Sequence, residues 1–237
     1  MVVVPGLTIG YVTDNAKAIE EAFSAFTDEY TVHLFDVRDD VPETYTIRDM
    51  GEDLAAAIRA LGLDRVYLYG CSMGGMESIY VAGKYPGLVE KLAVASSACR
   101  AGETADASIG GWIRLAGEGK RHELTDSMGR LIYSQGVYEA SKEAFSAMAD
   151  GLTGETLQRF IRTAKVIPGM DLTAEAAAIQ CPVLVLGSRG DRTLGVEGAV
   201  QIAELTGGEL YLYGEAYPHA VYDEAPDVRE RVKAFFD

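Results

Sequence analysis

The chain has 237 residues, with 21 Lys and Arg against 36 Asp and Glu, which gives a formal net charge of −15 at pH 7. This length is enough for one sizeable core, or for a core with an added lid, and excludes several independent domains. The acidic balance repels phosphate backbones and anionic lipid surfaces. We therefore expect neither a nucleic-acid partner nor a membrane partner.

The three cysteines, Cys71, Cys99 and Cys181, have neither the spacing of a zinc site nor that of a disulfide framework. No basic N-terminal segment leads into an apolar core like that of a signal peptide. No apolar run approaches the length of about 18 residues that a membrane span needs. Together these features favour a reducing, cytoplasmic location.

Short β-branched or aromatic runs alternate with longer segments of helical period. This alternation is typical of an α/β fold in which helices flank a mostly parallel sheet. We predict six strands, at Val2–Val4, Thr31–Asp36, Arg65–Tyr69, Leu92–Ser96, Val183–Gly187 and Glu209–Tyr213.

Two helices are marked clearly by their sequence signals. After the second predicted strand, Thr46 is placed to cap a helix whose apolar residues recur at helical spacing, and Gly62 is placed to end it. The last helix is predicted near Asp227–Phe236, directly after Pro226.

Residues 99 to 178 interrupt the alternation, because they contain no convincing strand. A helical insertion of this length between two strands is typical of a lid above the strand ends. We predict a core of residues 1–98 and 179–237 with a helical cap of residues 99–178; the alternative is further helices packed on the sheet. The helical patterns lie at Ile109–Ala116, Leu124–Tyr133, Tyr138–Met148 and Thr156–Val166.

The segment Gly70-Cys71-Ser72-Met73-Gly74 is a G-x-S-x-G pattern between a predicted strand and a helix-compatible segment. A serine on such a sharp turn adopts strained dihedral angles, and the flanking glycines remove Cβ atoms that would clash there. The turn also sets the serine at a helix N-terminus, where the N–H of Met73 is free to bind a developing negative charge. We predict Ser72 as a nucleophile and Met73 as an oxyanion donor. A thiol nucleophile at Cys71 is the weaker alternative.

A serine hydroxyl needs a base, and the chain has three histidines. His33 lies inside a predicted strand and His122 in the predicted cap. His219 lies in the loop between the last strand and the last helix, at the end of the sheet where Ser72 belongs. We therefore predict His219 as the general base.

The histidine in turn needs a carboxylate that fixes its tautomer. Asp191 follows the strand predicted at Val183–Gly187 and is our choice. The rivals are Glu197, which we expect to start the next helix, and Asp223, which is too close to His219 in sequence.

Further site residues are predicted from position alone. The second oxyanion donor should come from the loop after the first strand, where Gly6 lets the backbone turn and expose the N–H of Leu7; Thr8 is the alternative. Within the predicted cap, the side chains expected to line an apolar substrate pocket are Trp112, Tyr133 and Phe160.

With these motifs in chain order, the sequence resembles α/β hydrolases of the lidded, esterase-like group, over essentially its whole length. The resemblance implies a serine hydrolase or acyl transferase that needs no cofactor, and it implies no particular substrate. We expect no metal, and our leading hypothesis is hydrolysis of an ester-like bond in a small, fairly apolar substrate. The run Ser72-Met73-Gly74-Gly75-Met76 also resembles homoserine acyltransferases, so acyl transfer is an alternative. The same triad also suits C–C bond hydrolysis or a lyase reaction. In a different class, a low-turnover binding protein would keep only the pocket.

The sequence departs from the family pattern in three places. Pro5-Gly6 stands where relatives have His-Gly, and the loop after the second strand, Asp36–Asp40, lacks the usual glycines. The hairpin that usually precedes the first strand is absent, which makes Thr31–Asp36 a predicted sheet edge. Exposed edges favour pairing with another chain, so we expect a homodimer through this strand.

Overall fold

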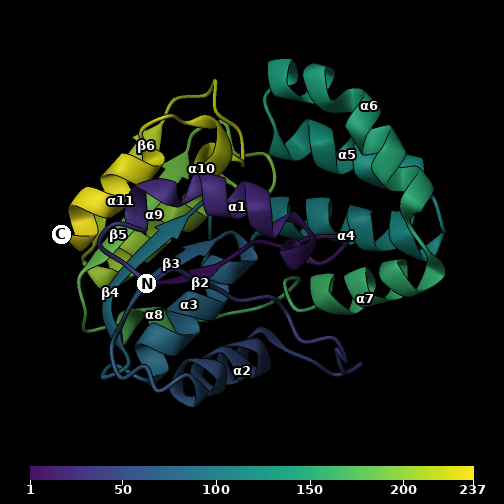
Figure 1. Ribbon diagram of the computed structural model, residues 1–237. Coiled ribbons are helices and arrows are strands. Elements are labelled where there is room, and N and C mark those ends of the chain that lie inside the picture. The colour runs from purple at the N-terminus through teal and green to yellow at the C-terminus, as the bar shows by residue number, and fades with distance from the viewer.

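The computed structural model describes residues 1–237 and contains one six-stranded sheet (Figure 1). Its strand order is β2-β1-β3-β4-β5-β6, and every neighbouring pair is parallel. The carboxyl ends of all six strands therefore meet at one edge, where loops bring distant residues together. The strands are β1 (Val2–Val4), β2 (His33–Leu34), β3 (Val66–Cys71), β4 (Val89–Ala95), β5 (Val183–Ser188) and β6 (Glu209–Tyr213).

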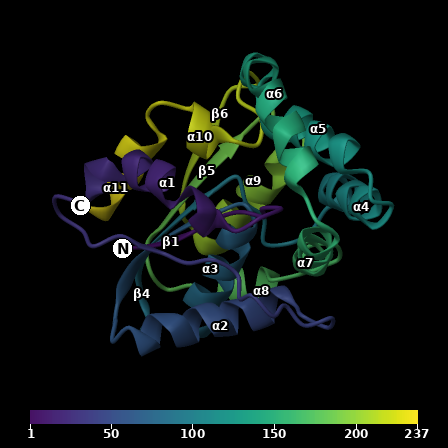
Figure 2. The same ribbon diagram turned by 45° about the vertical axis from the view of Figure 1, so that its right-hand side comes forward.

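Helices cover both faces of the sheet (Figure 2). Alternate strand residues such as Leu68 and Leu92 pack in a core with α2, α3, α8 and α9. Tyr69 and Ala93 point the other way and pack with α11 and the segment around Phe26. The flanking helices are α1 (Ala16–Ala22), α2 (Ile47–Ala60), α3 (Met73–Lys84), α8 (Thr173–Ala177), α9 (Val196–Thr206), α10 (Val221–Glu224) and α11 (Val228–Phe236), with short 3-10 turns at Val12–Asn15 and Ser24–Phe26.

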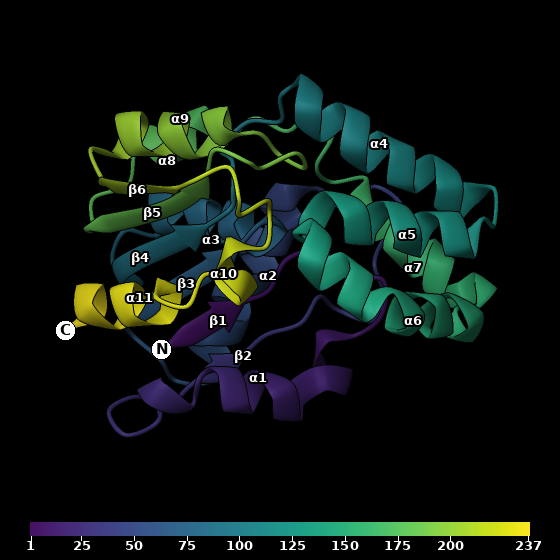
Figure 3. The ribbon, with the colours of Figure 1, turned by 90° about the horizontal axis from the view of Figure 1, so that it is seen from above.

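Four helices between β4 and β5 stand beside the sheet rather than on its faces (Figure 3). Trp112 and Phe160 anchor them in the main core, where both side chains are fully buried. The helices are α4 (Glu103–Gly117), α5 (Arg121–Ile132), α6 (Gln135–Gly151) and α7 (Gly154–Ala164). The helical content predicted here is confirmed, whereas the division into core and cap stays a prediction.

Both ends of α2 have the capping residues that the sequence predicted. The Thr46 hydroxyl accepts a hydrogen bond from the N–H of Asp49, and the Asp49 carboxylate accepts one from the N–H of Thr46, which completes a capping box. Gly62, at a φ of 71°, follows the last turn in the left-handed conformation that glycine favours.

The edge strand β2 is shorter than predicted, with two paired residues instead of the six expected at Thr31–Asp36. Strand β4 is longer, because it begins at Val89 and includes the charged pair Glu90 and Lys91. Lys91 extends along the sheet and donates to the carbonyl groups of Phe235 and Phe236 at the end of α11. Association of two chains through β2 stays a prediction. No helix of the structure combines the length and apolar character that crossing a bilayer requires.

Candidate active site

Ser72 lies on the sharp turn between β3 and α3. Its φ of 51° and ψ of −120° are strained for a non-glycine residue. Two close approaches explain the glycines around it: a Cβ on Gly74 would collide with the carbonyl of Val4, and one on Gly70 would collide with the carbonyl of Gly74. Ser97 holds the turn from the β4 side by donating to the carbonyl of Ser72 at 2.8 Å.

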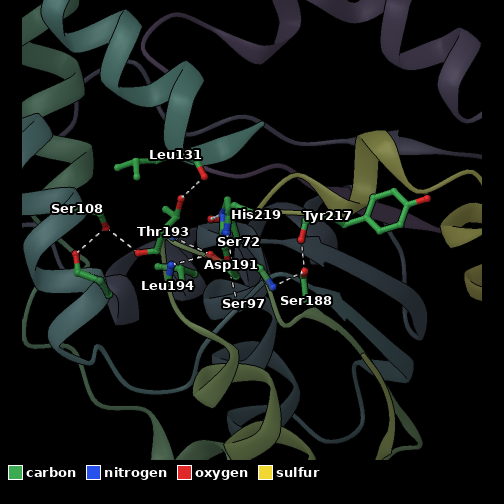
Figure 4. A network of polar contacts seen from close by, with 12 residues as sticks. Ser72, Ser97, Ser108, Leu131, Ser188, Asp191, Thr193, Leu194, Tyr217 and His219 are labelled. Carbon is green, nitrogen blue, oxygen red and sulfur yellow. Dashed lines mark hydrogen bonds and ion pairs between the residues drawn. The ribbon is translucent and has the colours of Figure 1, made fainter. Parts of the chain in front are cut away.

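His219 comes from the loop after β6 and meets Ser72 at the carboxyl edge of the sheet (Figure 4). Its Nε2 lies 2.9 Å from the Oγ of Ser72, and its Nδ1 lies 2.8 Å from Oδ2 of Asp191. The imidazole is 2% exposed and Ser72 is 7% exposed, so water competes little for these contacts. The structure thus brings together the three residues that the sequence singled out.

Asp191 lies in the loop after β5, and both of its carboxylate oxygens are engaged. Oδ1 accepts hydrogen bonds from the N–H groups of Thr193 and Leu194, at 2.8 and 2.9 Å, while Oδ2 faces His219. Burial alone would raise the pKa of Asp191, but the charge and hydrogen bond of His219 and these two N–H groups lower it below its usual value. An ionised Asp191 accepts from Nδ1–H, which leaves Nε2 as the acceptor for the serine proton.

One buried side chain ties the loops of Asp191 and His219 together. The Ser188 hydroxyl donates to the carbonyl of Tyr217, two residues before His219, and accepts from the N–H of Gly190, one residue before Asp191 (Figure 4). Ser188 is 1% exposed. Sequence reasoning missed this residue, because a serine at the end of a strand carries no distinctive signal.

Helix α5 is joined to the same two loops through its C-terminal carbonyl groups. The carbonyl of Leu131 accepts from Thr193 Oγ1 at 3.4 Å, and that of Ile132 accepts from the N–H of Ala220 at 2.8 Å. From α4, Ser108 donates to the carbonyl of Thr193 at 2.6 Å (Figure 4). The inserted helices are therefore bonded directly to the residues that flank Asp191 and His219.

The expected oxyanion donors lie near the serine by position. Met73 is the first residue of α3, where backbone N–H groups have no partner within the helix. Gly6 lies against Ser72, since a Cβ built on it would be 3.0 Å from the Cβ of Ser72. Leu7, the next residue, is partly buried against the main core. The roles of both N–H groups stay predictions.

The other candidates have different surroundings. His33 is half-buried in β2, and the exposed His122 lies 3.1 Å from Asp150. Glu197 lies in the first turn of α9, as expected from the sequence, and Asp223 is 3.8 Å from Arg229. Trp112 and Phe160 pack in the core, and Tyr133 packs against Phe145; their part in a substrate pocket stays a prediction. No group of three or more His, Cys, Asp and Glu side chains is arranged to hold a metal ion.

Comparison with known proteins agrees with this fold. A family model described as the alpha/beta hydrolase fold matches residues 2–114. A protein of Serratia proteamaculans named "Putative carbamate hydrolase RutD" is 28% identical over 189 residues, which make up 72% of this chain and 65% of that protein. The 3-oxoadipate enol-lactonase 1 of Acinetobacter baylyi is 25% identical, with 71% and 64% of the two chains aligned. The chain thus spans slightly less than two thirds of the length of these relatives.

Solved structures share the architecture over almost the whole chain. MGS-M2, an alpha/beta hydrolase enzyme from a Medee basin deep-sea metagenome library, superposes with a TM-score of 0.87 at 24% identity, covering 99% of this chain and 88% of that one. The enol-lactonase from Burkholderia xenovorans LB400 gives a TM-score of 0.83 at 19% identity, covering 99% and 90%. The sheet, the strand-to-helix turn and these likenesses define an α/β-hydrolase fold. The chain thus has the fold that the sequence resemblance predicted.

Proposed function

We propose that this chain is a serine hydrolase that cleaves an ester-like bond with Ser72, His219 and Asp191. The observation that carries the proposal is the unbroken series of contacts from carboxylate to imidazole to hydroxyl, at 2.8 and 2.9 Å. The contact between Ser72 and His219 is short enough for direct proton transfer, and the contact between His219 and Asp191 is short enough to orient the imidazole. The burial of all three groups strengthens their electrostatic coupling.

In this mechanism the Ser72 hydroxyl attacks the substrate carbonyl while Nε2 of His219 takes its proton. Asp191 stabilises the imidazolium that forms and keeps the proton on Nδ1. The N–H groups of Met73 and Leu7 bind the oxyanion of the tetrahedral intermediate. His219 then protonates the leaving group, and in the second half it activates the water that hydrolyses the acyl-enzyme.

The substrate class is argued from the protein and from its relatives. Relatives are named as a carbamate hydrolase and an enol-lactonase, and a carbamate and a lactone each present a carbonyl with a heteroatom leaving group. We extend that chemistry to this chain and propose a small ester or lactone, held between the sheet edge and a cap formed by α4–α7. Acyl transfer to an acceptor other than water uses the same first half-reaction and is the second candidate, favoured by the Ser72–Met76 sequence.

The test is covalent labelling of Ser72 together with turnover. The full chain should react with a fluorophosphonate probe and hydrolyse p-nitrophenyl butyrate. Ser72→Ala should abolish labelling and lower kcat by about 10⁶-fold, the loss seen when a comparable triad loses its serine. The matched control Ser24→Ala changes an exposed serine in the 3-10 turn Ser24–Phe26 and should keep both activities. An unlabelled wild type, or Ser72→Ala with wild-type turnover, would exclude the serine mechanism.

Product analysis separates hydrolysis from acyl transfer. With water alone, the expected product is butyric acid. With 1-butanol added as an acceptor, butyl butyrate as the main product would favour the transferase, and unchanged acid formation would favour the hydrolase.

A further inference from the structure

A cavity of about 400 Å³ lies beside the catalytic turn, and Pro5 and Gly6 form part of its wall. Its other walls come from the segment after β2, from α2 and from α3. The lining combines apolar side chains, among them Phe35, Met50 and Leu54, with several carboxyl groups. Neither Ser72 nor His219 lines it. The cavity therefore adjoins the site described above through Gly6 but does not contain those two side chains.

One carboxyl group in this cavity has no partner in the protein. Glu77 lies on the second turn of α3, is 6% exposed and makes neither a hydrogen bond nor an ion pair with another residue of the chain. An ionised carboxylate in such a place is costly unless something pairs with it. Burial, followed by the nearby charges of Asp36 and Asp53, raises the pKa of Glu77 to about 8. Burial therefore favours the protonated form of Glu77 at neutral pH.

The cavity is acidic, and its only cation is already engaged. Arg38 contacts both carboxylate oxygens of Asp40, at 2.8 and 3.1 Å, and reaches Asp53 at 3.2 Å. Asp36 accepts from the N–H groups of Val12 and Val37. Its Oδ1 lies 3.5 Å from the buried guanidinium of Arg159, so Asp36 too is already paired. These pairings leave one oxygen of Asp53 and the whole carboxyl group of Glu77 open to a ligand.

We propose that this cavity binds a small organic cation, namely a primary ammonium group on a short apolar body, with Glu77 as its counter-ion. The ammonium group supplies the missing partner of Glu77 and a donor for the open oxygen of Asp53. The apolar body packs against Phe35, Met50 and Leu54. A bare metal ion fits less well, because no three carboxylates here have a metal-binding arrangement. On binding, Glu77 gives up its proton to solvent and the ammonium stays protonated, so one proton leaves for each ligand bound.

Calorimetric titration with n-butylammonium chloride tests the proposal. The protein is the full Ser72→Ala chain, so that the outcome does not depend on turnover or on the proposed hydrolase activity. At pH 7, in two buffers of different ionisation enthalpy, we expect saturable one-site binding with release of close to one proton. The neutral isostere 1-butanol should bind on the order of tenfold more weakly or not at all, because it lacks the charge-assisted hydrogen bonds.

Variants assign the site. Glu77→Gln, added to the same chain, should weaken butylammonium binding on the order of tenfold and abolish proton release. The matched control Glu43→Gln removes a carboxylate that is 86% exposed and outside the cavity lining, and should bind as the parent does. Equal binding of 1-butanol, absence of saturation, or full affinity in Glu77→Gln would each overturn the proposal. Binding of MgCl₂ that depends on Glu77 and displaces butylammonium would also overturn it, in favour of a metal site. The comparison of two buffers uses the Ser72→Ala chain with Glu77 intact. It therefore tests the proposal even if Glu77→Gln fails to fold.

Discussion

Replacing Glu77 by glutamine is expected to stabilise the folded chain by an amount that grows with pH. In the fold, burial with Asp36 and Asp53 raises the pKa of Glu77 from 4.5 to about 8. The unfolded chain loses this proton near pH 4.5, so the folded state holds more protons between the two values and stability falls as the pH rises. At about 1.4 kcal/mol per pH unit, the unfolding free energy of the wild-type chain at pH 8.5 is about 5 kcal/mol lower than it would be if Glu77 kept its ordinary pKa in the fold. Glutamine, which stays neutral, avoids this loss.

Urea unfolding at pH values from 5 to 9 measures the effect. The difference in unfolding free energy between Glu77→Gln and wild type should be smallest near pH 5, rise through pH 8 and then level off. The wild-type curve is the reference, so the pH dependence of groups remote from Glu77 cancels in the difference. The charged and titratable groups near Glu77 in the cavity include Asp36, Asp53, Tyr45 and Arg38. Glu43→Gln should keep the wild-type pH dependence. A Glu77→Gln difference that stays constant from pH 5 to 9 would refute the premise that Glu77 is buried and protonated.

Three further predictions concern the catalytic loops. Asp191→Asn should lower kcat by about 10⁴-fold, because an amide stabilises the wrong imidazole tautomer; steady-state kinetics at near-wild-type rates would contradict this. Ser188→Ala should lower kcat about tenfold with little change in KM, because it frees the loops of Asp191 and His219 from each other; a lower melting temperature with unchanged kcat would indicate a structural role alone. Cys71 is 7% exposed and burial raises its pKa to about 12, so mass spectrometry should find it unmodified after iodoacetamide at pH 8, and Cys71→Ala should keep catalysis within about tenfold. Alkylation of Cys71 in the folded chain would instead support Cys71 as the nucleophile.

The central strands were predictable because burial on both faces leaves continuous apolar runs. Val2–Val4, whose three residues are all buried, agrees with the sequence prediction to the residue. The edge strand Glu209–Tyr213 also agrees to the residue, although it is only partly buried. The start of β4 was missed because Glu90 and Lys91 interrupt the apolar pattern, and only the fold shows that Lys91 reaches the carbonyl groups at the end of α11. From the sequence alone, a charged residue in a strand that finds its partner in the tertiary structure cannot be distinguished from a charged residue in a loop.

The convergence of the three side chains of the proposed triad was predictable for a topological reason. In an all-parallel sheet the carboxyl ends of strands share one edge, so a serine after β3, an aspartate after β5 and a histidine after β6 were expected to converge. Glu77 was not predictable. Its place in a helix of ordinary composition is compatible with a solvated face, and only the packing of α3 against the β1 loop and α2 encloses it.

The bonds between α5 and the catalytic loops also follow from helix chemistry rather than from a motif. A helix leaves its last four carbonyl groups without partners in the helix. In α5 the carbonyl of Gly129 accepts from the N–H of Tyr133, and the next three accept from the Arg192 side chain, the Thr193 hydroxyl and the N–H of Ala220. Every residue has a carbonyl group, so no sequence pattern marks this arrangement. Because Arg192 and Thr193 follow Asp191, and Ala220 follows His219, a displacement of α5 must either break these bonds or move Asp191 and His219 with it.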